Sequence, residues 1–439
     1  MTAADRATGR GVQRRVVVFD DDPTGTQTVS EVDVILDGSV RSIEHAFDSS
    51  GPLLLLTNTR SMPEREAVAR VRQSKERVEA IARAHDEVCT MVLRGDSTLR
   101  GHVFAEVDAV ANPGTVVLFV PAFPEGGRTT VAGEQRIRLD GVERNVADTE
   151  FARDATFGFR SRRLVDWVAE VGHGRRARMV PLDDLRETSG AALTTALLDA
   201  PPGEVVIPEI ADGADIDAAL RGLLAAEDAG RSIVIRSAAT FMAARAGLRA
   251  RYIDRVNLPP MARILVVCGS HTHASSEQLG VLDGDGHATL EVDAASDPAH
   301  VRRSVLRALD GSGVAVLATP RRFVEGTDLV QGRGFLDALA PVITAIAPSI
   351  DAVVAKGGIT SARVAEVLGA TRARVEGQVQ AGVALWTLEL PERRLPYVVV
   401  PGNVGGPRTL ADILRQMGAS SNPLARGPEH DTTVLEVHA

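Results

Sequence analysis

The chain has 439 residues, of which 44% are hydrophobic and 24% charged, and its formal net charge is −9 at pH 7. This composition is that of an ordinary globular protein, and the length predicts two domains with large buried cores. The negative charge argues against a general nucleic-acid binder, and aromatic residues, at 3%, are too scarce for base-stacking platforms.

Short apolar runs alternate with longer helix-like segments through the first 257 residues. Most runs are apolar throughout, which is typical of parallel strands that helices cover on both faces. This alternation predicts a doubly wound α/β fold. The expected strands are Val16–Asp20, Val32–Leu36, Leu53–Thr57, Thr90–Arg94, Val116–Pro121, Val205–Pro208 and Ile233–Arg236, and the clearest helices are Glu64–Ala84 and Asp215–Ala225.

A domain boundary is expected at Asn257–Met261, where two prolines follow a helix-like segment and a new strand begins. The chain then predicts two doubly wound domains, residues 1–257 and 258–420, with mostly parallel sheets that face a central cleft. Residues 421–439 are expected to form a flexible polar tail. The second series of strands is Ile264–Gly269, Leu290–Val292, Val314–Thr319, Ala352–Ala355 and Val398–Val400, with helices at Val301–Ala308 and Phe335–Ile346.

The cysteines and the first residues of the chain bear on the cellular location of the protein. Cys89 and Cys268 both lie in apolar runs, so we expect buried free thiols rather than a disulfide. The first residues lack the apolar core of a secretory signal, and no run reaches about 18 consecutive apolar residues. We therefore expect a cytoplasmic protein that has no membrane partner.

The segment Phe19–Thr28, FDDDPTGTQT, places three consecutive carboxylates at the end of the first expected strand. In a parallel sheet the carboxyl ends of the strands border the crevice in which ligands bind. Adjacent carboxylates repel one another unless a cation, a substrate or a proton relieves them. A functional cluster is therefore favoured, and the alternative is a helix N-cap in a solvated acidic loop.

The same segment also fits the D-x-D-x-T loop of the haloacid dehalogenase phosphatases, through Asp20, Asp22 and Thr24. Those enzymes need a downstream lysine and an acidic pair that holds Mg²⁺. Lys75 lies in a strongly polar helical segment, Lys356 lies in the other expected domain, and no suitable acidic pair follows a strand. A phosphatase is therefore the second choice.

Three further polar loops follow strands in the first half, at Thr57–Pro63, Leu93–His102 and Val120–Gly133. Their composition suits a small polyhydroxylated acid, because aspartate and serine pair with hydroxyl groups and arginine pairs with a carboxylate. Each loop alone could be an ordinary turn or helix cap, but four at one sheet edge predict a binding site. The residues expected to bind this substrate are Thr24, Arg60, Ser61, Asp96, Ser97, Thr98 and Arg128.

The second half carries three glycine-rich turns that follow strands and lead toward helices. Such turns expose backbone amides and favour phosphate groups. None matches the P-loop or the dinucleotide pattern, and His271 and His273 are too poorly spaced to predict a metal site. Each turn alone could be structural, but together they favour a nucleotide. The residues expected to bind it are Ser270, Lys356, Gly357, Gly358, Ile359, Thr360, Gly402, Asn403 and Gly405.

In their order along the chain these motifs resemble those of the four-carbon acid sugar kinases. The acidic turn of that family is similar to Asp21–Gly25, its D-S-T-x-x-G element to Asp96–Gly101, and its P-A-F-P-x-x-G-R-T-T segment to Pro121–Thr130. Further similar segments are Thr149–Phe159, Gly269-Ser270, Gly357–Thr360 and Gly402–Pro407. Two departures are Ile359, where many members have an acidic residue, and Asp20 with Pro23, where others have a small and an apolar residue.

The resemblance implies an ATP-dependent kinase that phosphorylates a terminal hydroxyl of a sugar acid such as threonate, erythronate or a 3-oxo-tetronate. It also implies an N-terminal domain that binds the sugar acid, a C-terminal domain that binds the nucleotide, and ATP with Mg²⁺ as cofactors. The expected partners are therefore small molecules, without nucleic acid or membrane, and the chain could form a homodimer. A sugar-acid-binding protein without catalysis is the non-enzymatic alternative.

Within this reading each part of the site receives an expected role. Asp22 would be the general base, and Asp21 would orient the hydroxyl or help to hold Mg²⁺ through water, whereas Asp20 would be structural. Arg60 would bind the substrate carboxylate, and Asp96 and Ser97 would bind its hydroxyl groups. Lys356 and the amides that follow Gly357 and Gly402 would neutralise the phosphates.

Overall fold

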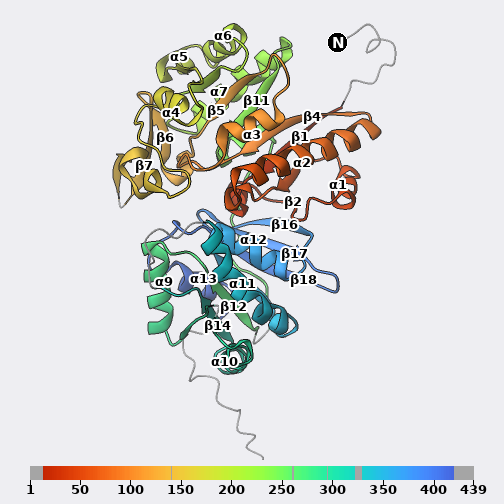
Figure 1. Cartoon of the computed structure of the whole chain (residues 1–439), viewed down its shortest axis with the longest axis vertical. Helices are drawn as coiled ribbons and strands as arrows, with labels where there is room; N and C mark the ends of the chain where they lie inside the picture. Colours follow the sequence, from red (N-terminus) through yellow and green to blue (C-terminus); the bar gives the residue numbers. More distant parts are fainter. Residues whose placement is uncertain (1–12, 140, 260–261, 294, 322–328, 420–439) are drawn as a thin grey trace, which may run out of the picture.

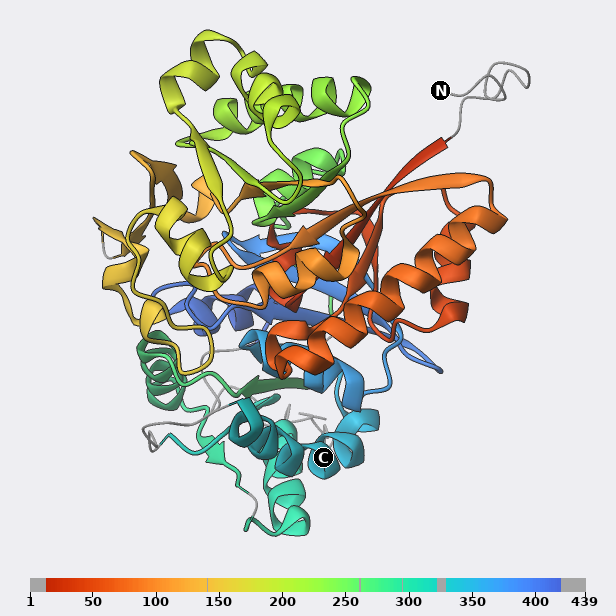
Figure 2. The same cartoon turned by 45° about the horizontal axis from the view of Figure 1, so that its top comes forward.

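The structure is a computed structural model that describes residues 13–139, 141–259, 262–293, 295–321 and 329–419. Figures 1 and 2 show the N-terminal half, coloured red to green, stacked on the C-terminal half, coloured green-blue to blue. The predicted tail, residues 421–439, lies outside the described residues.

A single sheet of fifteen strands runs through both halves. The α/β class with mostly parallel strands is confirmed, but the two expected sheets are joined into one. From one edge to the other the strands are β13 (Thr289–Glu291), β14 (Val314–Ala318), β12 (Ile264–Cys268), β15 (Ala352–Lys356), β18 (Arg394–Val400), β17 (Val383–Glu389), β16 (Arg372–Gln380), β2 (Val32–Ile35), β3 (Leu53–Leu56), β1 (Gln13–Asp20), β4 (Glu87–Arg94), β11 (Ile233–Ser237), β5 (Val116–Val120), β10 (Val205–Pro208) and β9 (Ala177–Val180).

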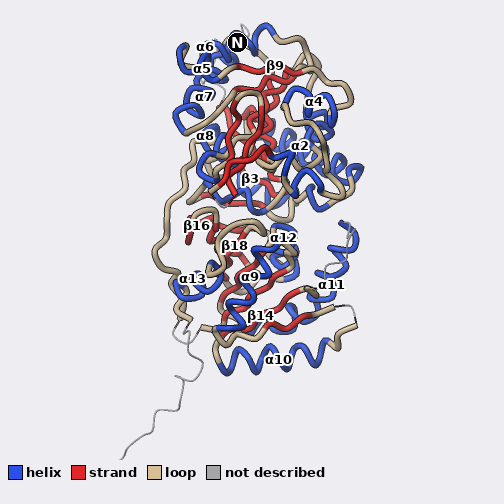
Figure 3. Tube along the Cα trace, turned by 90° about the vertical axis from the view of Figure 1, so that its left-hand side faces the viewer, coloured by secondary structure: helices blue, strands red, loops and turns tan. Residues whose placement is uncertain are grey.

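Helices cover both faces of this sheet, so that the strands form a central layer (Figure 3). This explains why strands such as β3 and β5 are buried along their whole length. The helices are α1 (Val40–Phe47), α2 (Glu64–Ala84), α3 (Val103–Val110), α4 (Leu164–Val171), α5 (Leu182–Glu187), α6 (Ala191–Asp199), α7 (Gly213–Asp228), α8 (Ala239–Arg245), α9 (His273–Gly284), α10 (Pro298–Gly311), α11 (Leu329–Ile346), α12 (Gly358–Val367) and α13 (Thr409–Gln416).

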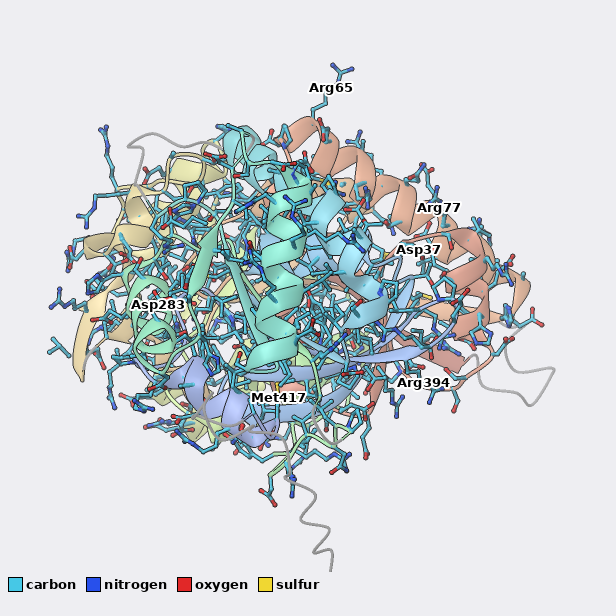
Figure 4. All side chains as sticks on the ribbon, turned by 90° about the horizontal axis from the view of Figure 1, so that it is seen from below. Asp37, Arg65, Arg77, Asp283, Arg394 and Met417 are labelled. Carbon is cyan, nitrogen blue, oxygen red and sulfur yellow. The ribbon has the colours of Figure 1, made fainter. Side chains whose placement is uncertain are left out.

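The outer faces of the helices are polar, as the exposed Arg65 on α2 illustrates (Figure 4). None of the described helices is both long and apolar enough to cross a membrane. Cys89 and Cys268 are free, as predicted; Cys268 is buried and Cys89 is partly buried.

The two halves are joined where β16 pairs antiparallel with β2. Two ion pairs reinforce the seam, because Arg372 and Arg374 both contact Asp33, at 3.2 and 3.1 Å. β16 and β17 were not predicted from the sequence, because the expected strands were mostly continuous apolar runs. Charged and apolar residues alternate in β16, which is the pattern of a strand that is buried on one face only. The hairpin is therefore the element that converts two sheets into one.

Antiparallel pairing at this seam would leave the carboxyl ends of β1 and β15 at opposite edges of a flat sheet. Six strand-to-strand steps separate β1 from β15. At the usual twist of roughly 20–25° a step, these steps rotate the strand direction by roughly 120–150°. Twist therefore turns the carboxyl ends of the two halves toward one another.

The acidic segment of the first half is anchored on the second half. It continues from β1 into a short 3₁₀ helix, η1 (Pro23–Thr28). The indole Nε1 of Trp386 donates a hydrogen bond to Oγ1 of Thr26 at 2.9 Å, and the side-chain amide of Gln378 donates to the carbonyl of Gln27. The position of the acidic turn therefore depends on both halves.

A second, small sheet corrects another sequence prediction. The segment Val120–Gly133 was expected to be a loop, but it enters a three-stranded antiparallel sheet made of β6 (Arg128–Val131), β7 (Glu134–Leu139) and β8 (Val142–Asn145). Its short, largely polar strands carry too weak an apolar pattern to be recognised. Arg128 consequently projects from the first position of a strand rather than from a loop.

Candidate functional site

A cavity of about 270 Å³ lies between the two halves, at the carboxyl ends of β1, β4, β12, β15 and β18. Both sets of expected site residues contribute to its wall. The expected residues that line it are Asp22, Thr24, Arg60, Asp96, Ser97, Arg128, Ser270, Gly357, Gly358, Ile359, Thr360, Gly402 and Asn403.

Five expected residues do not line this cavity, namely Asp21, Ser61, Thr98, Lys356 and Gly405. Ser61 lines a groove of about 850 Å³ between α2, α11 and α12, which borders the cavity at Ile359. Gly405 lines a groove of about 840 Å³, which adjoins the cavity because both are bordered by Arg128 and Asn403.

Asp22 is a buried carboxylate that is held firmly at the cavity wall. It accepts hydrogen bonds from the backbone N–H of Thr24 at 2.9 Å and from the Thr24 hydroxyl, and it pairs with Nη2 of Arg60 at 2.6 Å. Burial alone would raise the pKa of Asp22, but Arg60 and Arg94 outweigh it, and the pKa is lowered. Asp22 is therefore ionised near neutral pH.

The amino terminus of α12 lies directly beside Asp22. Gly357, its N-cap, has φ +109°, a left-handed conformation that favours glycine, and it offers no side chain to cap the helix. A Cβ atom at Gly358 would overlap the Asp22 carboxylate, so the two halves touch here. Uncapped amides at a helix amino terminus attract anions, and here they face the cavity.

A cluster of hydroxyl groups joins the other two turns of the second half. Oγ1 of Thr272 donates to the carbonyl of Gly402 at 2.7 Å, and Oγ of Ser275 donates to Oγ of Ser270 at 2.8 Å. Thr272 also caps α9 by accepting a hydrogen bond from the N–H of Ser275. The Ser270 and Gly402 turns are therefore fixed to one another at the cavity wall.

Lys356 is placed differently from the sequence expectation. Its side chain is fully buried, and its Nζ donates to the carbonyls of Pro401 and Val404, at 2.9 Å each. Burial lowers the pKa of Lys356 to about 8. The ammonium group therefore supports the Gly402 turn from behind, and direct contact with a phosphate would require it to leave these two carbonyls.

Arg94 relieves the repulsion between the three neighbouring aspartates. Its Nη1 lies 3.0 Å from Oδ1 of Asp20 and 3.4 Å from Oδ1 of Asp21, and it donates to the carbonyl of Asp22 at 3.2 Å. Arg236 pairs with the other oxygen of Asp21 at 3.1 Å and with Glu106. Asp20 and Asp21 are each 1% exposed, so they support the turn rather than face the cavity.

The protonation of Asp20 is the unusual feature of this network. Burial raises its pKa to about 6, although Arg94 opposes the shift. Its Oδ1 accepts a hydrogen bond from the N–H of Asp22 at 3.2 Å, whereas its buried Oδ2 has no hydrogen-bond partner among the described residues. Asp20 thus fixes the backbone of Asp22, although the negative charge of its own carboxylate is only partly compensated.

Arg60 and Asp96 form the next layer of the cavity wall. Nη1 of Arg60 lies 3.4 Å from Oδ2 of Asp96, and Nε of Arg100 lies 2.8 Å from the same oxygen. The hydroxyl of Thr98, which does not line the cavity, also donates to Asp96. Burial would raise the pKa of Asp96, but Arg100 and Arg60 lower it. The charge of Arg60 is thus shared between two protein carboxylates.

Arg128 stands apart from the other arginines of the cavity. It is 9% exposed, it donates to the carbonyl of Gly126 at 2.5 Å, and its guanidinium lies over the ring of Phe123, 5.7 Å from the centroid. No carboxylate within the described part of the chain forms an ion pair with it.

Sequence reasoning missed several residues of the site. Arg236 gave a usable signal, because an arginine inside the apolar strand β11 must find a buried partner. The cavity is also lined by Arg94, Arg100 and Gly269, which lie in turns that the sequence singled out but were not among the residues expected to bind a ligand. Further lining residues without an expected role are Gln27, Phe123, Phe151, Asp154, Phe157, Thr272, Pro401 and Val404. Within the described residues, no group of three or more His, Cys, Asp or Glu side chains is arranged to hold a metal ion.

Comparison with known proteins gives two family matches along the chain. The family described as a sugar-binding N-terminal domain matches residues 16–245, and the family described as a nucleotide-binding C-terminal domain matches residues 265–410. These boundaries fall on the two halves that meet at the cavity.

Two curated relatives and one solved structure are similar to parts or all of the chain. A D-erythronate kinase of Heliobacterium modesticaldum is 27% identical over 56% of this chain and 54% of its own length. A 3-oxo-tetronate kinase of Methylobacterium radiotolerans is 32% identical over 35% of this chain and 39% of its own length. The matches therefore span about half or less of these relatives. A solved protein of Haemophilus influenzae is 14% identical, with a TM-score of 0.60 over 91% of this chain and 98% of that one, and it shares the fold.

Proposed function

The chain belongs to the four-carbon acid sugar kinase family, and on that premise we propose that it transfers the terminal phosphoryl group of ATP to a hydroxyl of a four-carbon sugar acid. One observation carries the proposal. A buried, ionised aspartate of the sugar-binding half, Asp22, lies against the uncapped amino terminus of α12 in the nucleotide-binding half.

Phosphoryl transfer requires that the reactants are positioned, that phosphate charge is neutralised, and that a group accepts the hydroxyl proton. The amides at Gly358 and the turns at Ser270 and Gly402 would hold the phosphates. Asp22 would accept the proton from the terminal hydroxyl. Its low pKa suits this role, because in a loose transition state the proton leaves late and a weak base suffices.

The surrounding residues would orient these groups. Thr24 and Arg60 hold the Asp22 carboxylate in one direction, so it needs little reorganisation during the reaction. Asp96 and Ser97, farther along the wall, would bind the internal hydroxyl groups of the acid. Asp21 would act indirectly, because it is buried between Arg94 and Arg236.

Mg²⁺ is implied by kinase chemistry and would neutralise charge on the phosphates. Proteins commonly bind it through substrate phosphates, water and only one or two carboxylates. The cavity fits that mode rather than an all-protein site, since its carboxylates are already paired with arginines. Asp22 and Asp96 pair with Arg60, and Asp154 pairs with Arg100 at 3.8 Å. The ion would therefore arrive with the nucleotide.

The names of the relatives support the tetronate class of substrate, although they concern those proteins. The phosphatase alternative is disfavoured by one observation. Its nucleophile would be Asp20, which is 1% exposed and paired with Arg94 outside the cavity lining. A homodimer and a cytoplasmic location remain predictions.

The test is a panel of the stereoisomers of erythronate, threonate and 3-oxo-tetronate, incubated with the full chain, ATP and Mg²⁺. We expect ADP to form only when a suitable acid is present, and phosphorus NMR to show a phosphate ester on the terminal carbon. Release of inorganic phosphate from a sugar phosphate without ATP would support the phosphatase instead. Binding of an acid without ADP formation would support the non-catalytic alternative.

A further inference from the structure

The arginines that line the cavity differ in how their charge is compensated. Arg60 pairs with Asp22 and Asp96, Arg94 with Asp20 and Asp21, and Arg100 with Asp96. Arg128 is the exception. Throughout the residues that the structure describes, it forms no ion pair, and its Nε has no hydrogen-bond partner.

An uncompensated guanidinium in this position is unfavourable without a ligand. Arg128 is about nine-tenths buried, and burial is also the main reason that its pKa is lowered, with Asp96 opposing and Arg100 reinforcing the shift. A guanidinium carries five N–H donors, and the carbonyl of Gly126 accepts from only one of its nitrogens. The remaining donors can form a fork that matches a carboxylate.

From this imbalance we infer that Arg128, rather than Arg60, is the receptor for the carboxylate of the substrate and determines that the substrate is an acid. The inference rests on the proposed function, which it deepens. Arg60 was the sequence-based choice, but its charge is already committed to two protein carboxylates.

The neighbours of Arg128 suit such an ion pair. Phe123 lies under the guanidinium, and Phe151 and Phe157 contribute further apolar surface to the same cavity. Apolar walls exclude water, which strengthens an ion pair between Arg128 and a bound carboxylate. The stacked ring also restricts the plane of the guanidinium, so the fork is oriented in advance.

The arrangement further fixes the direction in which the acid binds. Arg60 bridges Asp22 to Asp96, and Asp96 in turn lies close enough to Arg128 to influence its pKa. The carboxylate at Arg128 and the terminal hydroxyl at Asp22 would therefore be at opposite ends of this series. The internal hydroxyl groups would lie between them, beside Asp96 and Ser97.

The decisive experiment compares an acid with its neutral analogue in the absence of nucleotide. Calorimetry would measure the Kd of D-erythronate and of erythritol for the wild type, Arg128→Gln and Arg128→Lys. The control is Arg144→Gln, which removes an exposed arginine from β8 of the same small sheet.

We expect the wild type to prefer the acid by on the order of 10²-fold or more, because erythritol would leave Arg128 unpaired. Arg128→Gln should abolish most of that preference by weakening acid binding alone. Arg128→Lys should retain part of it, since a point charge replaces a bidentate fork. Arg144→Gln should match the wild type.

Several outcomes would overturn the inference. These are an Arg128→Gln variant that binds D-erythronate like the wild type, an equal loss of acid and polyol binding, or a wild type without preference for the acid. If Arg128→Gln does not fold, the ratio of the Kd of erythritol to that of D-erythronate in Arg128→Lys decides instead. A wild type that binds the acid through Arg128 but forms no ADP would refute the kinase proposal and leave the inference standing. If Arg128→Gln phosphorylates the acid normally and with unchanged KM, the kinase proposal would stand and the inference about Arg128 would be refuted.

Discussion

The carboxylate of Asp22 and the backbone of Gly358 are in contact across the boundary between the two halves, so closely that a side chain at position 358 has no room. A carboxylate that the sugar-binding half supplies thus lies beside the helix terminus at which the nucleotide-binding half would hold a phosphate. Catalysis should therefore be sensitive to changes at this contact, and stability to changes in the ion-pair network behind it.

Gly358→Ala should impair catalysis without weakening the fold. The new methyl group would displace the Asp22 carboxylate, and a shift of about 1 Å in a reacting group can cost on the order of 10²-fold in kcat/KM. Steady-state kinetics with ATP and the best acid would measure the loss. The control is Gly280→Ala in α9, where a Cβ atom meets nothing within 4 Å. It should stabilise the protein by up to about 1 kcal/mol and leave kinetics unchanged. Equal activity in the two variants would contradict the contact.

Asp22→Asn should lower kcat on the order of 10²-fold or more, because the amide cannot accept the hydroxyl proton. Binding of the acid, measured by calorimetry, should persist, since shape and size are retained. Asp21→Asn should act on stability instead. It leaves Arg94 and Arg236 with less compensation, and the free energy of unfolding should fall by about 3–5 kcal/mol. Near-normal turnover in Asp22→Asn, with turnover lost in a stable Asp21→Asn, would reverse the two roles.

Asp20 should make stability depend on pH in a defined direction. Its folded pKa of about 6 lies above the ordinary value of 3.8, so the folded state keeps a proton that the unfolded state releases. The stabilisation from this proton is complete below about pH 4 and is lost as the pH rises through 6. The side chain of Asp20→Asn does not titrate, so the variant does not lose this stabilisation. Between pH 4 and 7 its free energy of unfolding should therefore rise by roughly 3 kcal/mol relative to that of the wild type. Urea unfolding across that range would measure the difference, and a constant difference would refute the shift.

Lys356→Met should loosen the turn that follows Pro401. Two carbonyls lose a charged donor, so KM for ATP should rise about 10-fold, which corresponds to roughly 1.5 kcal/mol for one such hydrogen bond. KM for the sugar acid should not change, because Lys356 lies outside the cavity lining. An unchanged KM for ATP would leave this lysine without a role in nucleotide binding.

The same variant tests the buried charge of Lys356. The folded pKa of about 8 lies below the ordinary 10.5, so between these values the unfolded state binds more protons. Stability of the wild type should therefore rise relative to Lys356→Met as the pH increases from 8 toward 10.5, by roughly 3 kcal/mol in total. A difference that stays flat over this range would contradict the burial of a charged ammonium.

The sequence by itself determined the local elements and the turns. Apolar runs such as Leu53–Leu56 and Val116–Val120 identify strands that are covered on both faces, and the polar segments after them identify the edge that binds ligands. The sequence also identified Asp22 and Gly358 as site residues, because each stands in a turn that ends a strand. These are local patterns, which propensity and side-chain periodicity control.

Only the tertiary structure decided which charges are available. Asp20, Asp21 and Asp22 are adjacent in the sequence, but Arg94 and Arg236, which lie 74 and 215 residues from their aspartate partners, bury the first two. Arg60 and Arg128 both follow polar turns, yet only Arg60 meets carboxylates of its own chain. Lys356 ends a strand near the cavity, but its ammonium group donates hydrogen bonds to the carbonyls of a turn behind it. The physical reason is that charge compensation acts through space. It depends on which strands become neighbours, and the β2–β16 pairing and the twist of the sheet set those neighbours.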